Sequence, residues 1–148
     1  MASAMTEYPQ YDAERAEKMV SAVGSESGGL PEYLGMRISE VGPGTLTCEI
    51  PITPELLNPF GAAHGGVISA LVDHVLGAVC MPVVPAGHWP ATSEFKLNFT
   101  APARAGVMRA DARIVALSKR TAIVRVDVTN EGRLVGVAQG TVTIMPPR

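Results

Sequence analysis

Hydrophobic positions recur at two different periods along the chain, and the change of period locates one long helix among several strands. From residue 65 to about residue 81 the large apolar side chains recur at helical spacing, and they are Val67, Ile68, Leu71, Val72, Val75, Leu76 and Val79. This spacing predicts an amphipathic helix. Pro82 and Pro85 then end it, because proline lacks the backbone donor that a helix needs.

Strand-like segments lie on both sides of this helix. Before it, residues 30–41 and 45–52 flank a Gly-Pro-Gly turn, and in the second segment polar and apolar residues alternate. After it, four more strand-like segments cover residues 91–99, 107–117, 121–130 and 134–144. The sequence Asn130-Glu131-Gly132-Arg133 between the last two is a strong hairpin signal.

The N-terminal part of the chain predicts a tail and a second helix. Residues 1–11 are expected to be a flexible tail, and residues 12–23 are rich in helix formers, with Asp12 as the N-cap. Gly24, Gly28 and Gly29 break that helix, and residues 51–60 predict a loop with one short helical turn. We therefore expect one α+β domain over residues 12–148, with an antiparallel sheet wrapped around the central helix.

The composition of the chain limits the kinds of molecule that it can bind. The 148 residues are 47% hydrophobic and 18% charged, with a net charge of −2 and no Lys/Arg block, which argues against nucleic acid or an anionic membrane. No apolar run approaches the ~20 residues that a membrane span needs, and no secretory signal is visible. Cys48 and Cys80 lack Cys or His neighbours at metal-ligand spacing, so we expect no metal, no cofactor and a cytoplasmic location.

The other face of the long helix carries the first candidate catalytic residue. Opposite the apolar residues lie Gly66, Ala70, Asp73 and Gly77, so a single carboxylate stands among small side chains. Small residues allow another backbone or a ligand to approach closely. The alternative is that Asp73 simply points to solvent, as most aspartates do.

The start of the same helix predicts an anion-binding site. His64-Gly65-Gly66 opens the helix directly after a loop that contains Asn58. Glycines at this position leave backbone N–H groups uncovered at the positive end of the helix dipole, where they can polarise a carbonyl oxygen.

Distance along the helix adds a constraint on how these groups act together. Gly65 and Asp73 are eight residues apart, which is about 12 Å at a rise of ~1.5 Å per residue. Catalytic contacts are roughly 3 Å, so one chain cannot supply both groups to one substrate. If both act, Asp73 comes from a second chain whose helix runs antiparallel, which predicts a symmetric homodimer.

This set of residues resembles the PaaI-type branch of the hotdog-fold acyl-CoA thioesterases. The similarity rests on Asn58, separated by five residues from His64-Gly65-Gly66, on Asp73 nine residues after His64, and on the element order over residues 34–144. The resemblance implies a hotdog fold, hydrolysis of acyl-CoA thioesters between two subunits, and pairing of dimers into tetramers.

The resemblance also implies a role for each residue. The Gly65 amide would polarise the thioester carbonyl with help from Asn58, and Asp73 would act as general base or as a nucleophile that forms a mixed anhydride. Thr92 would orient the water, with Ser93 beside it as a second candidate. His64 would be a structural residue of the loop.

Several alternatives remain open for these residues. Asn58 fits an ordinary turn, Thr92 fits a structural strand residue, and the two glycines fit close helix–sheet packing. Gly66, Lys119 and Arg120 are candidate contacts for CoA, although a solvated hairpin tip explains the two cations equally well.

Other functions on the same fold also remain open. A non-catalytic acyl-CoA-binding or sensing protein is the main alternative, although a pure binder needs no base. A hydratase fits poorly, because the His and Asp spacing is wrong for it. The acyl group, the choice between CoA and an acyl carrier protein, and the packing of a tetramer are not determined by the sequence.

Overall fold

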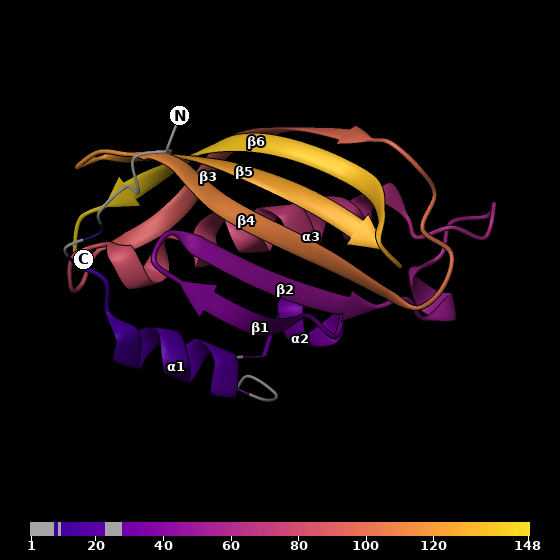
Figure 1. The fold of residues 1–148 in the computed structure, drawn as a ribbon, viewed down its shortest axis with the longest axis horizontal. Helices are drawn as coiled ribbons and strands as arrows, with labels where there is room; N and C mark the ends of the chain where they lie inside the picture. Colours follow the sequence, from indigo (N-terminus) through magenta and orange to yellow (C-terminus); the bar gives the residue numbers. More distant parts are fainter. Residues whose placement is uncertain (1–7, 9, 23–27) are drawn as a thin grey trace.

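A six-stranded antiparallel sheet curves around one long helix (Figure 1). The computed structural model describes residues 8, 10–22 and 28–148. The strands, in the spatial order β1-β2-β4-β5-β6-β3, are β1 Arg37–Gly42, β2 Thr45–Pro51, β4 Val107–Leu117, β5 Thr121–Asn130, β6 Arg133–Met145 and β3 Trp89–Phe99. The helices are α1 Ala13–Ser21, α2 Leu30–Tyr33 and α3 Gly65–Ala78, with 3-10 turns at η1 Pro54–Leu56 and η2 Met81–Val83. This is the α+β hotdog fold expected from the sequence, including its additional N-terminal helix.

The helix α3 forms the centre of the core. Its buried residues are Ile68, Leu71, Val72, Val75 and Leu76, which face the concave side of the sheet. The sheet meets them with Val and Ala side chains, chiefly from β4, β5 and β6. The predicted end at residue 81 is three residues too late, because the chain turns after Ala78 and enters η2.

The stretch Gly65–Val83 is 19 residues long and has the length and apolarity of a membrane span, with a mean hydropathy of 1.7. The expectation that no apolar run approaches the length of a membrane span was therefore wrong. Within this domain the stretch comprises the core helix α3 and the turn that follows it, and 56% of its apolar 18-residue window is buried inside the structure.

The N-terminal helix begins where it was predicted. The Asp12 side chain accepts a hydrogen bond from the Arg15 amide at 2.9 Å, which is the expected N-cap. The Asp12 N–H donates to the Pro82 carbonyl at 2.7 Å, and Tyr8 and Tyr11 pack against the core. Residues 1–7 and 9 of the predicted tail, and residues 23 and 24 at the predicted helix end, lie outside the described residues.

Two differences from the predicted elements have local causes. Residues 30–33, expected in a strand, form α2, where Pro31 occupies the first turn and needs no helical hydrogen bond. The strand β3 begins at Trp89, earlier than predicted, and includes Pro90, which an edge strand tolerates.

The remaining strands agree with prediction. β4 and β5 have the predicted bounds, and the hairpin before β6 is confirmed, because Glu131 and Gly132 both have positive φ angles of 49° and 77°.

Candidate active site

The loop before α3 is held in a tight conformation by Asn58. Its Oδ1 atom accepts hydrogen bonds from the Phe60 amide at 2.9 Å and the Ala62 amide at 3.2 Å. A bridge between Leu57 and Ala63 closes the loop at its base. The Asn58 side chain therefore has a structural role through its oxygen. Its amide nitrogen makes no hydrogen bond to any described residue and remains able to donate.

His64 caps the N-terminus of α3. Its Nδ1 atom accepts a hydrogen bond from the Gly66 amide at 2.9 Å, so Nδ1 carries no proton in this arrangement and a neutral ring is protonated at Nε2. A Cβ atom at Gly66 would lie 3.1 Å from the same Nδ1 atom, which explains why glycine suits this position. The Gly66 N–H is thus engaged within the loop.

Gly65 presents the first free amide of the helix. Its N–H has no hydrogen-bond acceptor among the described residues. A cavity of about 380 Å³ lies in front of it and is lined by Asn58, Ala63, Gly65, Ile68, Phe99 and Ala103. The Phe99 ring covers Gly65 so closely that a Cβ atom there would lie 3.0 Å from its Cζ atom. Asn58 and Gly65, each of which keeps a donor without a partner among the described residues, therefore line one cavity at the positive end of α3.

Asp73 lies on the exposed face of α3, in the third helical turn. Its carboxylate accepts no hydrogen bond from the described residues, and it does not line the Gly65 cavity. Close by, a Cβ atom added to Gly77 would meet nothing within 4 Å, so this face is open in the single chain. Burial lowers the pKa of the neighbouring His74, and the charge of Asp73 partly opposes that shift.

Thr92 is partly buried on β3, opposite Val142 and directly before a bulge. Its hydroxyl has no hydrogen-bond partner in the part of the chain that the structure describes. Ser93 is engaged instead, since its Oγ atom lies 2.5 Å from Thr143 Oγ1.

Lys119 and Arg120 are exposed on the turn between β4 and β5. Lys119 lines a different cavity of about 550 Å³ together with Val83 and Val84, which follow the C-terminal end of α3. Within one chain, the structure therefore brings Asn58 and Gly65 together and leaves Asp73, Thr92 and Lys119 away from their cavity.

One feature of this region was not predicted from the sequence. It is Phe99, which is 57% exposed and in contact with Gly65, and its sequence signal is an aromatic residue at the end of a predicted strand. Away from this cavity, Cys48 and Cys80 are buried as expected, and burial raises the pKa of each thiol to about 12. Among the described residues, no group of three or more His, Cys, Asp or Glu side chains is arranged to hold a metal ion.

Comparisons with known proteins agree with this fold. The family described as the thioesterase superfamily matches residues 60–137, more than half of the chain. The 1,4-dihydroxy-2-naphthoyl-CoA hydrolase of Listeria monocytogenes is 26% identical over 121 residues, which are 81% of this chain and 98% of that protein. Human acyl-coenzyme A thioesterase 13 is 28% identical over 99 residues, which are 66% of this chain and 70% of that protein.

Among solved structures, a mutant of the phenylacetic acid degradation protein PaaI from Thermus thermophilus is similar. It superposes with a TM-score of 0.70 at 32% identity, covering 76% of this chain and 96% of that one. The chain therefore belongs to the thioesterase superfamily, as a hotdog-fold thioesterase of the PaaI type.

Proposed function

We propose that this thioesterase hydrolyses acyl-CoA thioesters in a site shared by two copies of the chain. The observation that carries the proposal is the pair of unengaged donors, Gly65 N–H and Asn58 Nδ2, at the N-terminus of α3. The thioester carbonyl oxygen binds these donors. The negative charge that develops on this oxygen during attack is stabilised by both hydrogen bonds and by the helix dipole.

Asp73 of the second copy acts as the general base. Its carboxylate takes a proton from a water molecule while the water oxygen attacks the carbonyl carbon. The C–S bond then breaks and the carboxylic acid is released, while Asp73 returns its proton to the departing thiolate of CoA. Thr92 orients the water through its hydroxyl, which is free to bond.

A second copy is needed because α3 is a straight helix of 14 residues, about 21 Å long, which holds Gly65 and Asp73 of one chain too far apart to act on one substrate. An antiparallel partner helix brings its own Asp73 toward Gly65. It also brings the end of α3, with the nearby Lys119 and Arg120, toward the same site, where both cations attract the phosphates of CoA.

The sheet offers an edge for this pairing. β1 is covered by α1, whereas none of the described residues pairs with the outer edge of β3, which is 11 residues long (Figure 1). A long unpaired edge is a template for another strand. Antiparallel pairing of two β3 strands across a two-fold axis makes the two α3 helices antiparallel, and we propose this homodimer in the cytoplasm.

The experiment that tests this function is thiol release by the purified protein from a panel of acyl-CoAs. The panel contains short, medium and long chains together with phenylacetyl-CoA and hydroxybenzoyl-CoA, and Asp73→Asn is measured beside the wild type. We expect release that Asp73→Asn abolishes while folding is retained. Binding of CoA esters without any release would support the acyl-CoA-binding alternative instead.

A further inference from the structure

The segment 100–106, which connects β3 to β4, is anchored to the neighbouring hairpin of β5 and β6. The Thr100 amide donates a hydrogen bond to the Val135 carbonyl at 3.0 Å. The Asn130 side chain donates through Nδ2 to the Ala105 carbonyl at 2.9 Å. The segment is therefore a fixed support beside the loop that precedes α3.

This support holds the loop at two places. The Ala63 amide donates to the Ala103 carbonyl at 2.7 Å, which fixes the end of the loop nearest α3. The Arg104 side chain fixes its tip, because Nη1 donates to the Phe60 carbonyl at 2.9 Å and to the Gly61 carbonyl at 3.2 Å. No other donor among the described residues reaches either carbonyl. The tip of the loop therefore depends on Arg104.

One peptide group connects Arg104 to Asn58. The carbonyl of this group belongs to Gly61 and accepts from Arg104, and its N–H belongs to Ala62 and donates to Asn58 Oδ1 at 3.2 Å. Hydrogen bonds arranged in such a chain polarise one another. The cation draws electron density toward the Gly61 oxygen, the Ala62 N–H becomes a stronger donor, and the Asn58 amide is polarised in turn. Asn58 Nδ2 is then a stronger donor as well.

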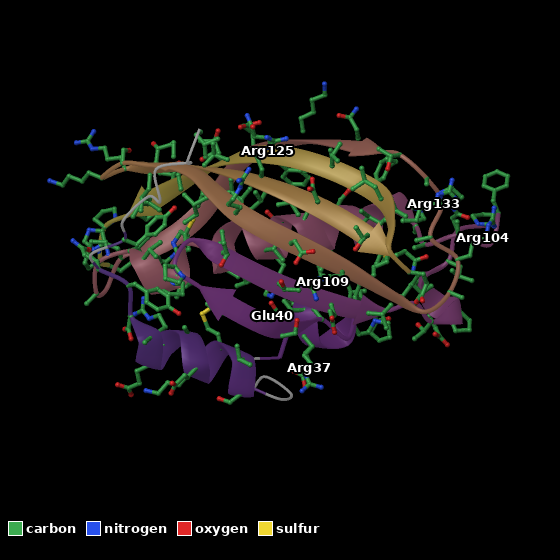
Figure 2. The ribbon with its side chains drawn as sticks, viewed as in Figure 1. Arg37, Glu40, Arg104, Arg109, Arg125 and Arg133 are labelled. Atoms are coloured by element: carbon green, nitrogen blue, oxygen red, sulfur yellow. The ribbon has the colours of Figure 1, made fainter. Side chains whose placement is uncertain are left out.

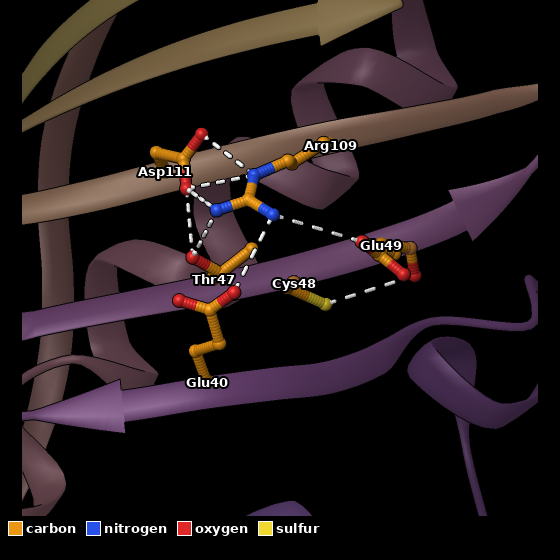
Figure 3. Close-up of polar contacts among 6 residues, drawn as sticks. All are labelled: Glu40, Thr47, Cys48, Glu49, Arg109 and Asp111. Atoms are coloured by element: carbon orange, nitrogen blue, oxygen red, sulfur yellow. Dashed lines mark hydrogen bonds and ion pairs between the residues drawn. The ribbon is translucent and has the colours of Figure 1, made fainter.

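The charge of Arg104 is not cancelled by a carboxylate. Arg104 forms no ion pair with the described residues. Arg109 is the contrasting case, since its guanidinium lies 3.0 Å from Asp111 and 3.5 Å from Glu40 (Figure 3). Arg104 is exposed, so water and salt screen its charge at longer range. Its effect on the site therefore passes through the hydrogen bonds to the loop.

We propose that Arg104 is a positioning residue for the donor Asn58. The inference rests on the proposed function, in which Asn58 Nδ2 binds the thioester carbonyl oxygen. Arg104 does not line the cavity between Asn58 and Gly65, and it acts by fixing and polarising the loop. The negative charge on the substrate oxygen is largest in the transition state, so Arg104 should raise kcat more than it lowers KM.

The first test is thiol release by the full chain carrying Arg104→Gln or Arg104→Lys. Arg133→Gln is the matched control, because Arg133 lies at the same end of the molecule and its side chain forms no hydrogen bond or ion pair with the described residues (Figure 2). Complete removal of an oxyanion donor costs about 100- to 1000-fold in kcat, so Arg104→Gln, which weakens one, should cost about 10- to 100-fold. KM should stay within about threefold of the wild type. Arg104→Lys keeps the cation and should lose less.

The second test needs no substrate. The NMR signals of the Asn58 side-chain amide, in isotope-labelled protein, should shift in Arg104→Gln and stay in place in Arg133→Gln. The Ala62 amide should also exchange its hydrogen faster in Arg104→Gln, because its acceptor is held less firmly. Both variants replace exposed side chains, and circular dichroism checks that they fold.

The outcomes separate this inference from the proposed function. A folded wild type that releases no thiol from any acyl-CoA contradicts the proposed function. An active wild type overturns the role of Arg104 if Arg104→Gln leaves kcat unchanged, if it raises KM alone as a lost substrate contact would, or if Arg133→Gln lowers kcat equally. Unshifted Asn58 signals in Arg104→Gln would also overturn it.

Discussion

Gly140 sits where β6, β3 and α3 meet, and its replacement by alanine tests how tightly these elements are packed. A Cβ atom at this position would lie 2.6 Å from the Glu94 carbonyl oxygen, 2.7 Å from Phe95 Cβ and 3.1 Å from Leu76 Cδ1. The first two atoms belong to the paired strand β3, where Phe95 is opposite Gly140. Neither can move without displacing that strand, so Gly140→Ala overpacks the core.

The expected magnitude follows from two opposing terms. Overpacking of a core costs about 1–3 kcal/mol, and the lower entropy of the unfolded chain returns about 0.4–1 kcal/mol for Gly→Ala. Because two of the contacts are shorter than 3 Å and involve the paired strand, the cost lies in the upper part of that range, at about 2–3 kcal/mol. The net loss is then about 1–2.6 kcal/mol, which lowers the midpoint of thermal unfolding by roughly 2–10 °C for a domain of this size.

Gly136→Ala on the same strand is the matched control. Its Cβ atom would meet Leu97 Cδ1 at 3.3 Å, the far end of a flexible side chain, and Val128 Cβ at 3.6 Å. We expect the thermal unfolding midpoint of Gly136→Ala to lie within about 2 °C of that of the wild type. The estimate behind this is that about 1 kcal/mol of stability corresponds to 2–4 °C in the midpoint. Equal midpoints for the two variants, measured by circular dichroism or calorimetry, would refute the close contact at Gly140.

Three further predictions concern α3 and the thiols. His64→Ala removes the cap on the Gly66 amide and should lower the free energy of unfolding by about 1 kcal/mol, whereas His64→Asn should retain most of it; equal urea midpoints would refute the cap. Cys48 and Cys80, with pKa values raised to about 12, should resist a disulfide reagent at pH 8 in the native protein and react fully in guanidinium; two fast native thiols would contradict their burial. Burial lowers the pKa of His74, so below the ordinary histidine pKa of about 6.5 the unfolded chain binds more protons than the folded chain. The free energy of unfolding should therefore fall as the pH drops through that range. His74→Gln should flatten this dependence in urea titrations at pH 5 to 8, and an unchanged slope would exclude His74 as its cause.

The elements that were predicted correctly are those with strong local signals. The helical spacing from Val67 to Val79 predicts α3, and turn residues bound β4 and β5 at the observed positions. The four-residue helix α2 was missed because one turn is too short to show a period. The end of α3 was placed too late because Val79 and Cys80 remain buried after the helix stops, so burial alone does not distinguish them from helical residues.

Part of the candidate site was also predictable, because its residues are close in the chain. Asn58, His64 and Gly65 lie within one loop and helix start, so their spacing alone predicts that they meet. Phe99 approaches Gly65 from a strand that begins 24 residues further along, a contact that only the fold creates. The alignment of residues across the sheet was not predictable either, since it depends on which residues of different strands stand opposite each other, and bulges such as that between Ile114 and Ala116 shift this register.

Complementation between two inactive variants tests most directly whether the site is shared by two chains. Asp73→Ala removes the proposed base, and Asn58→Ala removes a proposed donor at the other end of the site. Each homodimer has two damaged sites, whereas a mixed dimer contains one intact site and one that carries both changes. After confirmed subunit exchange, an equimolar mixture should recover about a quarter of the wild-type thiol release by random pairing, because half of the dimers then carry one intact site of two. No recovery would contradict an active site that takes Asp73 from one chain and Asn58 with Gly65 from another.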